Sequence, residues 1–101
     1  MLKNSKTGMI YMHCRIRVAD FPKWKAAMEA DAKAQHDAGM RLIHLWRGVE
    51  ESKMAFFVLE VYSVEKARAF LNPAAVAEAS KAAGVLDFEW HFVESVEGYS
   101  A

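Results

Sequence analysis

Hydrophobic and polar residues alternate in four segments of the chain, at about 9–18, 41–47, 54–62 and 88–93. Since successive side chains of a strand point to opposite faces of a sheet, each segment is predicted to be a β-strand. After the first of these segments, apolar residues instead recur every three or four positions, which is typical of a helix with one buried side. A second helical stretch is predicted after the third segment. The predicted order is therefore strand, helix, strand, strand, helix, strand.

The first helix is predicted over residues 21–38. Asp20 can cap its first turn, Pro22 is tolerated there because the first turn needs no N–H donor, and Gly39 is suited to end it. Four apolar side chains recur along one side of this helix and are expected to face the sheet: Phe21, Trp24, Met28 and Ala32.

The second helix is predicted to be interrupted. Ser63 can cap a segment that runs from 64 to 71, and Asn72-Pro73 then breaks the helical pattern because the residue before a proline avoids helical geometry. An alanine-rich segment, 74–83, follows and ends at Gly84.

This order of elements predicts an α+β fold, a ferredoxin-like βαββαβ sandwich. Right-handed crossovers place both helices on the same face of a four-stranded antiparallel sheet with strand order 4-1-3-2. We expect one domain over residues 9–96, preceded by a flexible lead-in at 1–8 and followed by a tail at 97–101.

The opposite face of the sheet is left uncovered and is expected to be rich in apolar side chains. In residues 41–47, the alternation places Leu42, His44 and Trp46 on one face. An uncovered patch of this size is unusual on a monomer, so a second copy is expected to bury it in a homodimer that closes into a shared barrel. The residues expected on it are Tyr11, Trp46, Met54, Phe56, Val58 and Tyr62.

Composition and charge argue against some classes of binding partner. The 101 residues carry 13 basic and 13 acidic side chains and a formal net charge of zero, so no overall field attracts nucleic acid or an anionic membrane. The longest apolar run is too short to span a bilayer, and the lone Cys14 fits a reducing compartment. We therefore expect a cytoplasmic protein that binds neither nucleic acid nor membrane.

The chain resembles the dimeric α+β barrel superfamily, which includes antibiotic biosynthesis monooxygenases and cyclase-like proteins. The resemblance covers about residues 9–96 and rests on the element order and on two segments, DFPKWK at 20–25 and VLEV at 58–61 leading into SVEKARAF at 63–70. It implies a small bacterial homodimer that acts as a monooxygenase, cyclase or isomerase on a hydrophobic or aromatic molecule. The heme-degrading branch is not favoured, because the first strand lacks asparagine and residues 64–83 lack histidine.

Candidate chemistry lies on the uncovered face of the sheet. His13, His91 and Glu60 are predicted to converge there as catalytic residues, because imidazoles titrate near neutral pH and a carboxylate in an apolar enclosure can have its pKa raised toward that range. His13 and Glu60 form the predicted acid–base pair. Six further residues are expected to bind the substrate: Tyr11, Arg15, His44, Trp46, Phe56 and Tyr62.

Three alternatives use the same face. Its histidines and Glu60 are acceptable ligands for zinc or iron, but they have no local ligand motif, so neither a metal nor a cofactor is expected. RNA-recognition domains share the element order, yet the glycines of their third-strand signature are missing and Glu60 would repel phosphate. A non-catalytic dimer that binds a small hydrophobic molecule needs the cavity without proton transfer.

Overall fold

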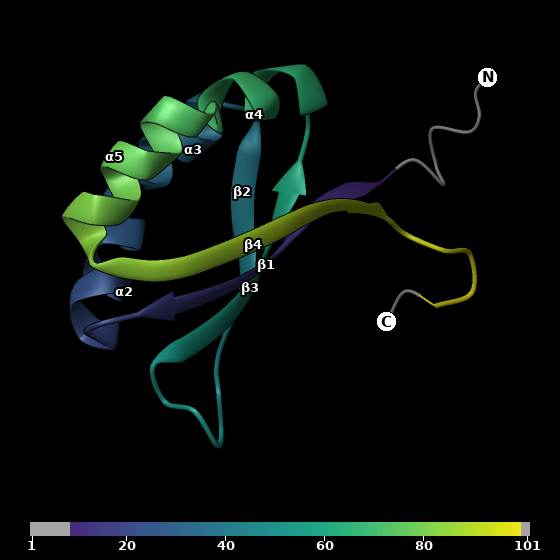
Figure 1. Ribbon diagram of the computed structural model, residues 1–101. Helices are drawn as coiled ribbons and strands as arrows, with labels where there is room; N and C mark the ends of the chain where they lie inside the picture. Colours follow the sequence, from purple (N-terminus) through teal and green to yellow (C-terminus); the bar gives the residue numbers. More distant parts are fainter. Residues whose placement is uncertain (1–8, 100–101) are drawn as a thin grey trace.

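The computed structural model describes residues 9–99 as a four-stranded antiparallel sheet with all helices on one face (Figure 1). The strand order is β2-β3-β1-β4, as predicted. The strands are β1 (Ile10–Val18), β2 (Met40–Arg47), β3 (Met54–Val61) and β4 (Val85–Glu94). The ferredoxin-like fold is therefore confirmed, while the lead-in predicted for residues 1–8 lies outside the described residues.

The first predicted helix is divided into α2 (Phe21–Ala30) and α3 (Ala32–Asp37). Asp31 lies between them with ψ of 4°, outside the helical range. The apolar stripe expected on this helix was wrong at Ala32, which is exposed. A residue seven positions after Met28 lies on the same side of a helix, so the buried side continues through Gln35, with Ala32 at its edge.

The second predicted helix is divided where the sequence indicated, into α4 (Val64–Phe70) and α5 (Pro73–Ala83). The Asn72 side chain accepts a hydrogen bond from the N–H of Ala75 at 3.0 Å and so caps α5. Gly84 ends this helix with φ of +73°, a left-handed conformation that glycine adopts without strain.

The predicted caps of the other helices are also present. The carboxylate of Asp20 accepts from the N–H of Lys23 at 3.1 Å, and the Ser63 hydroxyl accepts from the N–H of Lys66 at 3.2 Å. Each bond satisfies a donor that has no partner inside its own helix. No helix within residues 9–99 is long and apolar enough to cross a membrane.

The core lies between the sheet and the helices. Alternate residues of β1 and β3 are buried there, and Trp24 of α2 packs with its ring centroid 5.5 Å from that of Phe57 on β3. Cys14 is also on this face and fully buried, and burial raises the pKa of its thiol. The thiol is therefore a packing group and not a nucleophile.

One prediction for β2 was wrong. Leu42 was expected to share a face with His44 and Trp46, but it pairs with the core residue Leu59, whereas His44 pairs with Val58 on the opposite face. Ile43 is the additional residue of a β-bulge between these two pairs, and a bulge shifts the alternation by one position. His44 and Trp46 still lie on the uncovered face, which we call the open face.

Candidate functional site

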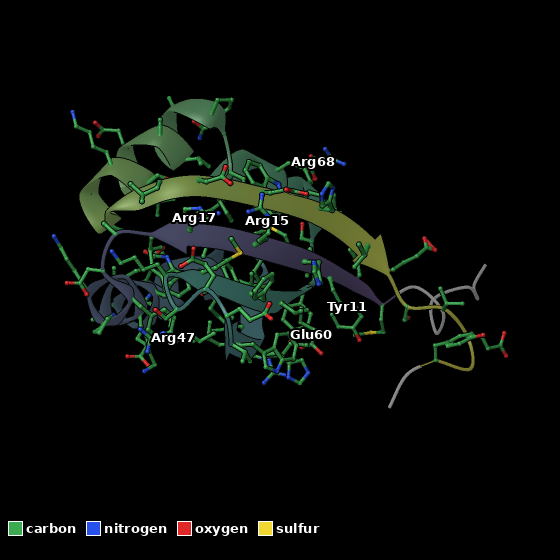
Figure 2. All side chains as sticks on the ribbon, turned by 60° about the horizontal axis from the view of Figure 1, so that its bottom comes forward. Tyr11, Arg15, Arg17, Arg47, Glu60 and Arg68 are labelled. Carbon is green, nitrogen blue, oxygen red and sulfur yellow. The ribbon has the colours of Figure 1, made fainter. Side chains whose placement is uncertain are left out.

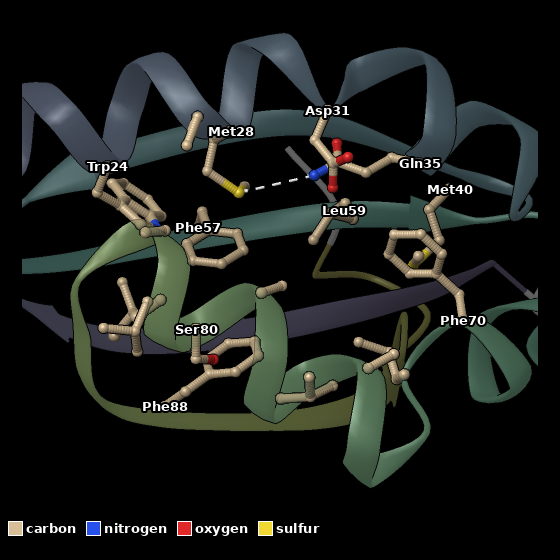
Figure 3. Close-up of a pocket in the computed structure, with 18 of the residues that line it drawn as sticks. Trp24, Met28, Asp31, Gln35, Met40, Phe57, Leu59, Phe70, Ser80 and Phe88 are labelled. Atoms are coloured by element: carbon tan, nitrogen blue, oxygen red, sulfur yellow. Dashed lines mark hydrogen bonds between the residues drawn. The ribbon is translucent and has the colours of Figure 1, made fainter.

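A cavity of about 470 Å³ lies between the helices and the covered face of the sheet (Figure 3). Met12, Phe57 and Leu59 line it from the sheet, and Trp24 and Met28 line it from α2. Phe70, Leu71 and the inner side of α5 line the remaining side of the cavity, which is partly open to solvent. The lining is therefore almost entirely apolar, as in sites that bind the body of a small organic molecule.

The cavity exists because α5 is rich in alanine. Its inner side presents Ala75, Ala79 and Ala83, spaced four residues apart and hence on one side of the helix, and their side chains are too short to reach the sheet. No residue of α5 is buried, so this helix packs loosely over the larger residues below it. The small size of the alanine side chains on α5 therefore leaves the space that forms the cavity.

Three polar side chains line the cavity: Asp31, Gln35 and Ser80. Gln35 is 7% exposed, and its amide nitrogen donates to the Met28 sulfur at 3.6 Å. Among the described residues that line the cavity, Asp31 is the only one with a titratable side chain. The cavity is therefore better equipped to bind and orient a molecule than to exchange protons with it.

Sequence reasoning did not predict this cavity, because hydrophobic periodicity marks which side of a helix is buried and not whether that side fills its space. The sequence nevertheless contains a feature that indicates the cavity. The inner side of α5 carries mainly alanine, whereas the strands below carry phenylalanine, leucine and methionine. Such a mismatch in side-chain size leaves a void when backbone spacing is fixed by neighbouring contacts.

The predicted site residues lie together on the open face, and none of them lines the cavity. Figure 2 shows Tyr11, Arg15 and Glu60 along the two central strands. His13 faces His91 across the β1–β4 pair, as predicted, and faces Val58 across the β1–β3 pair. The sheet therefore separates the predicted chemistry from the cavity.

Glu60 is held by residues other than His13. Its Oε1 accepts hydrogen bonds from the Tyr62 hydroxyl at 2.5 Å and from the Arg41 guanidinium at 3.0 Å. These bonds, that of Tyr62 first, lower the pKa of the Glu60 carboxyl. The direction is opposite to that expected for a base adjusted toward neutral pH.

A second cluster of charged side chains links β1 to β4. Arg15 contacts Glu89 at 2.7 Å and Asp87 at 3.2 Å, and His91 approaches the other Glu89 oxygen at 2.9 Å. The bond from Arg15, followed by that from His91, lowers the pKa of Glu89 to about 2. Arg15 is consequently paired within its own chain.

The remaining predicted binding residues form an aromatic surface. His44 and Trp46 stack with ring centroids 5.0 Å apart, Trp46 is 50% exposed, and Tyr62 is 61% exposed. Phe56 pairs with Trp46 on the neighbouring strand and is half-buried. Within residues 9–99, no cluster of histidine, cysteine and acidic residues has a geometry that could hold a metal ion.

Solved structures share this fold over most of the chain. An antibiotic biosynthesis monooxygenase-like protein from Bordetella bronchiseptica has 20% sequence identity and a TM-score of 0.69, over 88% of this chain and 98% of that one. A variant of SnoaB, a cofactor-independent oxygenase from Streptomyces nogalater, has 11% identity and a TM-score of 0.66, over 93% and 99%. A dimeric ferredoxin-like protein from an uncultured marine organism has 10% identity and a TM-score of 0.59, over 100% and 99%.

The fold is that of the antibiotic biosynthesis monooxygenase-like structures. The resemblance noted in the sequence is thereby confirmed at the level of the fold. No protein-family model matches the chain, and no curated protein matches it. The reaction must therefore be argued from the residues of this chain.

The low pKa of Glu89 gives a pH-dependent prediction. The ionised carboxylate stabilises the fold fully above its ordinary pKa of 4.5, and this stabilisation is lost as the pH falls through about 2. We expect Glu89→Gln to lower the thermal unfolding temperature at pH 7, and the difference from the parent protein to shrink between pH 4.5 and 2. Glu78→Gln, at an exposed position of α5, is the matched control. A difference that does not change with pH would contradict the assignment.

Proposed function

We propose that the chain is a cytoplasmic homodimer that binds a small, largely apolar molecule in the cavity between α5 and the sheet. The observation that carries this proposal is the volume of about 470 Å³ lined mainly by aromatic and aliphatic side chains. Sites for drug-sized molecules have volumes of roughly 300–1,000 Å³ and combine an apolar lining with a few polar groups. Asp31, Gln35 and Ser80 supply those groups here.

The open face is the proposed dimer interface. Tyr11, Phe56 and Val58 on the central strands remain half-buried, with the exposed Trp46 and Tyr62 beside them. A second copy related by a two-fold axis would remove this aromatic surface from water. The similarity in fold to a dimeric ferredoxin-like protein supports the same arrangement.

A monooxygenase-, cyclase- or isomerase-like reaction is supported by the similarity in fold to SnoaB, which is a cofactor-independent oxygenase. In this chain the candidate groups for proton transfer are the imidazoles of His13 and His91, which face each other on the open face. In a homodimer they would lie inside the shared barrel, so this reaction would use a site separate from the cavity, on the other side of the sheet. The alternative is a non-catalytic dimer that uses the cavity only to bind.

Filling the cavity should abolish binding. The double variant Ala79→Leu/Ala83→Leu places larger side chains on the inner side of α5, and we expect it to weaken the affinity for 2-methylnaphthalene at least tenfold by calorimetry. Its thermal stability should not fall, because the added carbons occupy existing space. The control Ala74→Leu/Ala77→Leu alters exposed positions that do not line the cavity. Equal affinities for the two double variants would contradict the proposal.

The dimer is tested at Phe56. Sedimentation of the parent protein should report about twice the 11.4 kDa chain mass. Phe56→Asp places a charge in the centre of the proposed interface, so we expect it to sediment as a monomer at micromolar concentration while its circular dichroism spectrum remains that of a folded protein. Glu65→Asp, on the exposed surface of α4, is a control expected to remain dimeric. A parent protein that sediments as a monomer would refute the interface.

Acid–base catalysis on the open face is tested by hydrogen–deuterium exchange at the acidic carbon of 2-indanone. If His13 and His91 act as a unit, His13→Ala and His91→Ala should each slow the catalysed exchange by about 100-fold. The double variant should then be little worse than the more damaging single change. Exchange that is equally fast in the parent and in His13→Ala would favour the non-catalytic alternative.

A further inference from the structure

The Gln35 side chain is the most deeply buried polar group that lines the cavity. It is 7% exposed, and it belongs to α3, directly after the interruption at Asp31 (Figure 3). Within residues 9–99, its carboxamide makes one hydrogen bond, from Nε2 to the Met28 sulfur at 3.6 Å. A thioether is a weak acceptor, so this contact satisfies the carboxamide poorly.

The chemistry of that contact fixes the orientation of the carboxamide. A thioether sulfur accepts hydrogen bonds but has no proton to donate, so the nitrogen must face Met28. The carboxamide oxygen is then left for the cavity. No fully buried side-chain nitrogen or oxygen within the described residues lacks a partner, which means that this oxygen is not sealed inside protein. Gln35 lines this cavity and also borders a smaller hollow with His36 and Arg41. Figure 3 shows its carboxamide directed toward Met28 and Leu59, two residues that line the cavity.

A hydrogen-bond acceptor without a partner in an apolar cavity favours ligands that carry a hydrogen-bond donor. We propose that Gln35 is a specificity-determining residue that accepts a hydrogen bond from a hydroxyl or N–H group on an otherwise apolar ligand. This inference rests on the proposed function of the cavity as a binding site. An ether or hydrocarbon of the same shape fits the apolar lining but leaves the oxygen without a partner.

The negative charge of Asp31, at the same end of the cavity, adds a preference that depends on the charge of the ligand. Asp31 lies one helical turn before Gln35 and also lines the cavity, and no cationic side chain among the described residues lines it. The carboxylate also accepts hydrogen bonds and repels anions. The preferred ligand is therefore a neutral or cationic donor, and a carboxylate-bearing molecule of the same size is disfavoured.

The test compares matched ligands on the full chain by calorimetry at pH 7. 2-Naphthol has a hydroxyl donor, 2-methoxynaphthalene retains the ring and the oxygen without the donor, and 2-naphthoate adds a negative charge. We expect 2-naphthol to bind about fivefold to tenfold more tightly than 2-methoxynaphthalene, the ratio that corresponds to one net hydrogen bond. 2-Naphthoate should bind most weakly of the three.

The variant Gln35→Met keeps the length of the side chain and removes the acceptor. It should reduce the ratio of the two neutral affinities to about one, chiefly by weakening 2-naphthol, while the thermal unfolding temperature does not fall. A merely structural glutamine would instead destabilise the fold when replaced and leave the ratio unchanged. In the second arm, Asp31→Asn should strengthen the binding of 2-naphthoate and leave that of 2-methoxynaphthalene unaltered.

The outcomes separate this inference from the proposed function. If none of the three ligands binds the parent protein, the cavity is not a binding site and both proposals are wrong. If all three bind and the parent shows no preference for 2-naphthol over 2-methoxynaphthalene, the cavity binds apolar molecules but Gln35 does not select among them. A preference that persists in Gln35→Met would likewise overturn the role of Gln35.

Discussion

The restriction of all helices to one face of the sheet is the constraint on which the rest of the structure depends. Figure 1 shows α2 and α3 on the same side of the sheet as α4 and α5, the arrangement that right-handed crossovers produce in this strand order. Two surfaces of different character result. The covered face builds the core and its cavity, whereas the open face keeps aromatic and charged side chains that no helix of this chain contacts.

Charges on the open face are largely paired with each other. Arg15 is bound by Glu89 and Asp87, and Arg41 is bound by Glu60. Exposed pairs of this kind add little stability, but they neutralise the charge that would otherwise oppose the approach of a second sheet. In the proposed dimer, the apolar residues among them would supply the main driving force for association. The bonding of Glu60 fits a role in that interface better than one in proton transfer.

The sequence predicted the faces of the sheet correctly wherever the strands are regular, because alternation depends only on the period of two. It failed at Leu42, since Ile43 forms a bulge that no local pattern announces. The partners of Glu60 could not be predicted, because Arg41 and Tyr62 approach it through pairing across strands and through side-chain conformation. The site residues were therefore predicted from residue type alone, and they all lie on the open face.

The cavity was missed for a different reason. The segment 74–83 was predicted to be helical, but a helical pattern does not show that alanine leaves space on the inner side of α5. Gln35 was overlooked because only apolar positions were assigned to the buried side, although it lies seven residues after Met28 and hence on the same side of the helix. Residue volume along a predicted inner surface, in addition to its polarity, is the property that would have located this site.

The central claim is that an apolar ligand enters the covered face of the sheet and not the open one. The most direct measurement is a heteronuclear NMR titration of the methyl-labelled protein with 2-methylnaphthalene. The account predicts the largest chemical-shift changes at the methyl groups of Met12, Met28 and Ala79, which line the cavity. Changes confined to the methyl groups of Val58 and Val93, with the cavity methyl groups unmoved, would place the ligand on the open face and contradict the account.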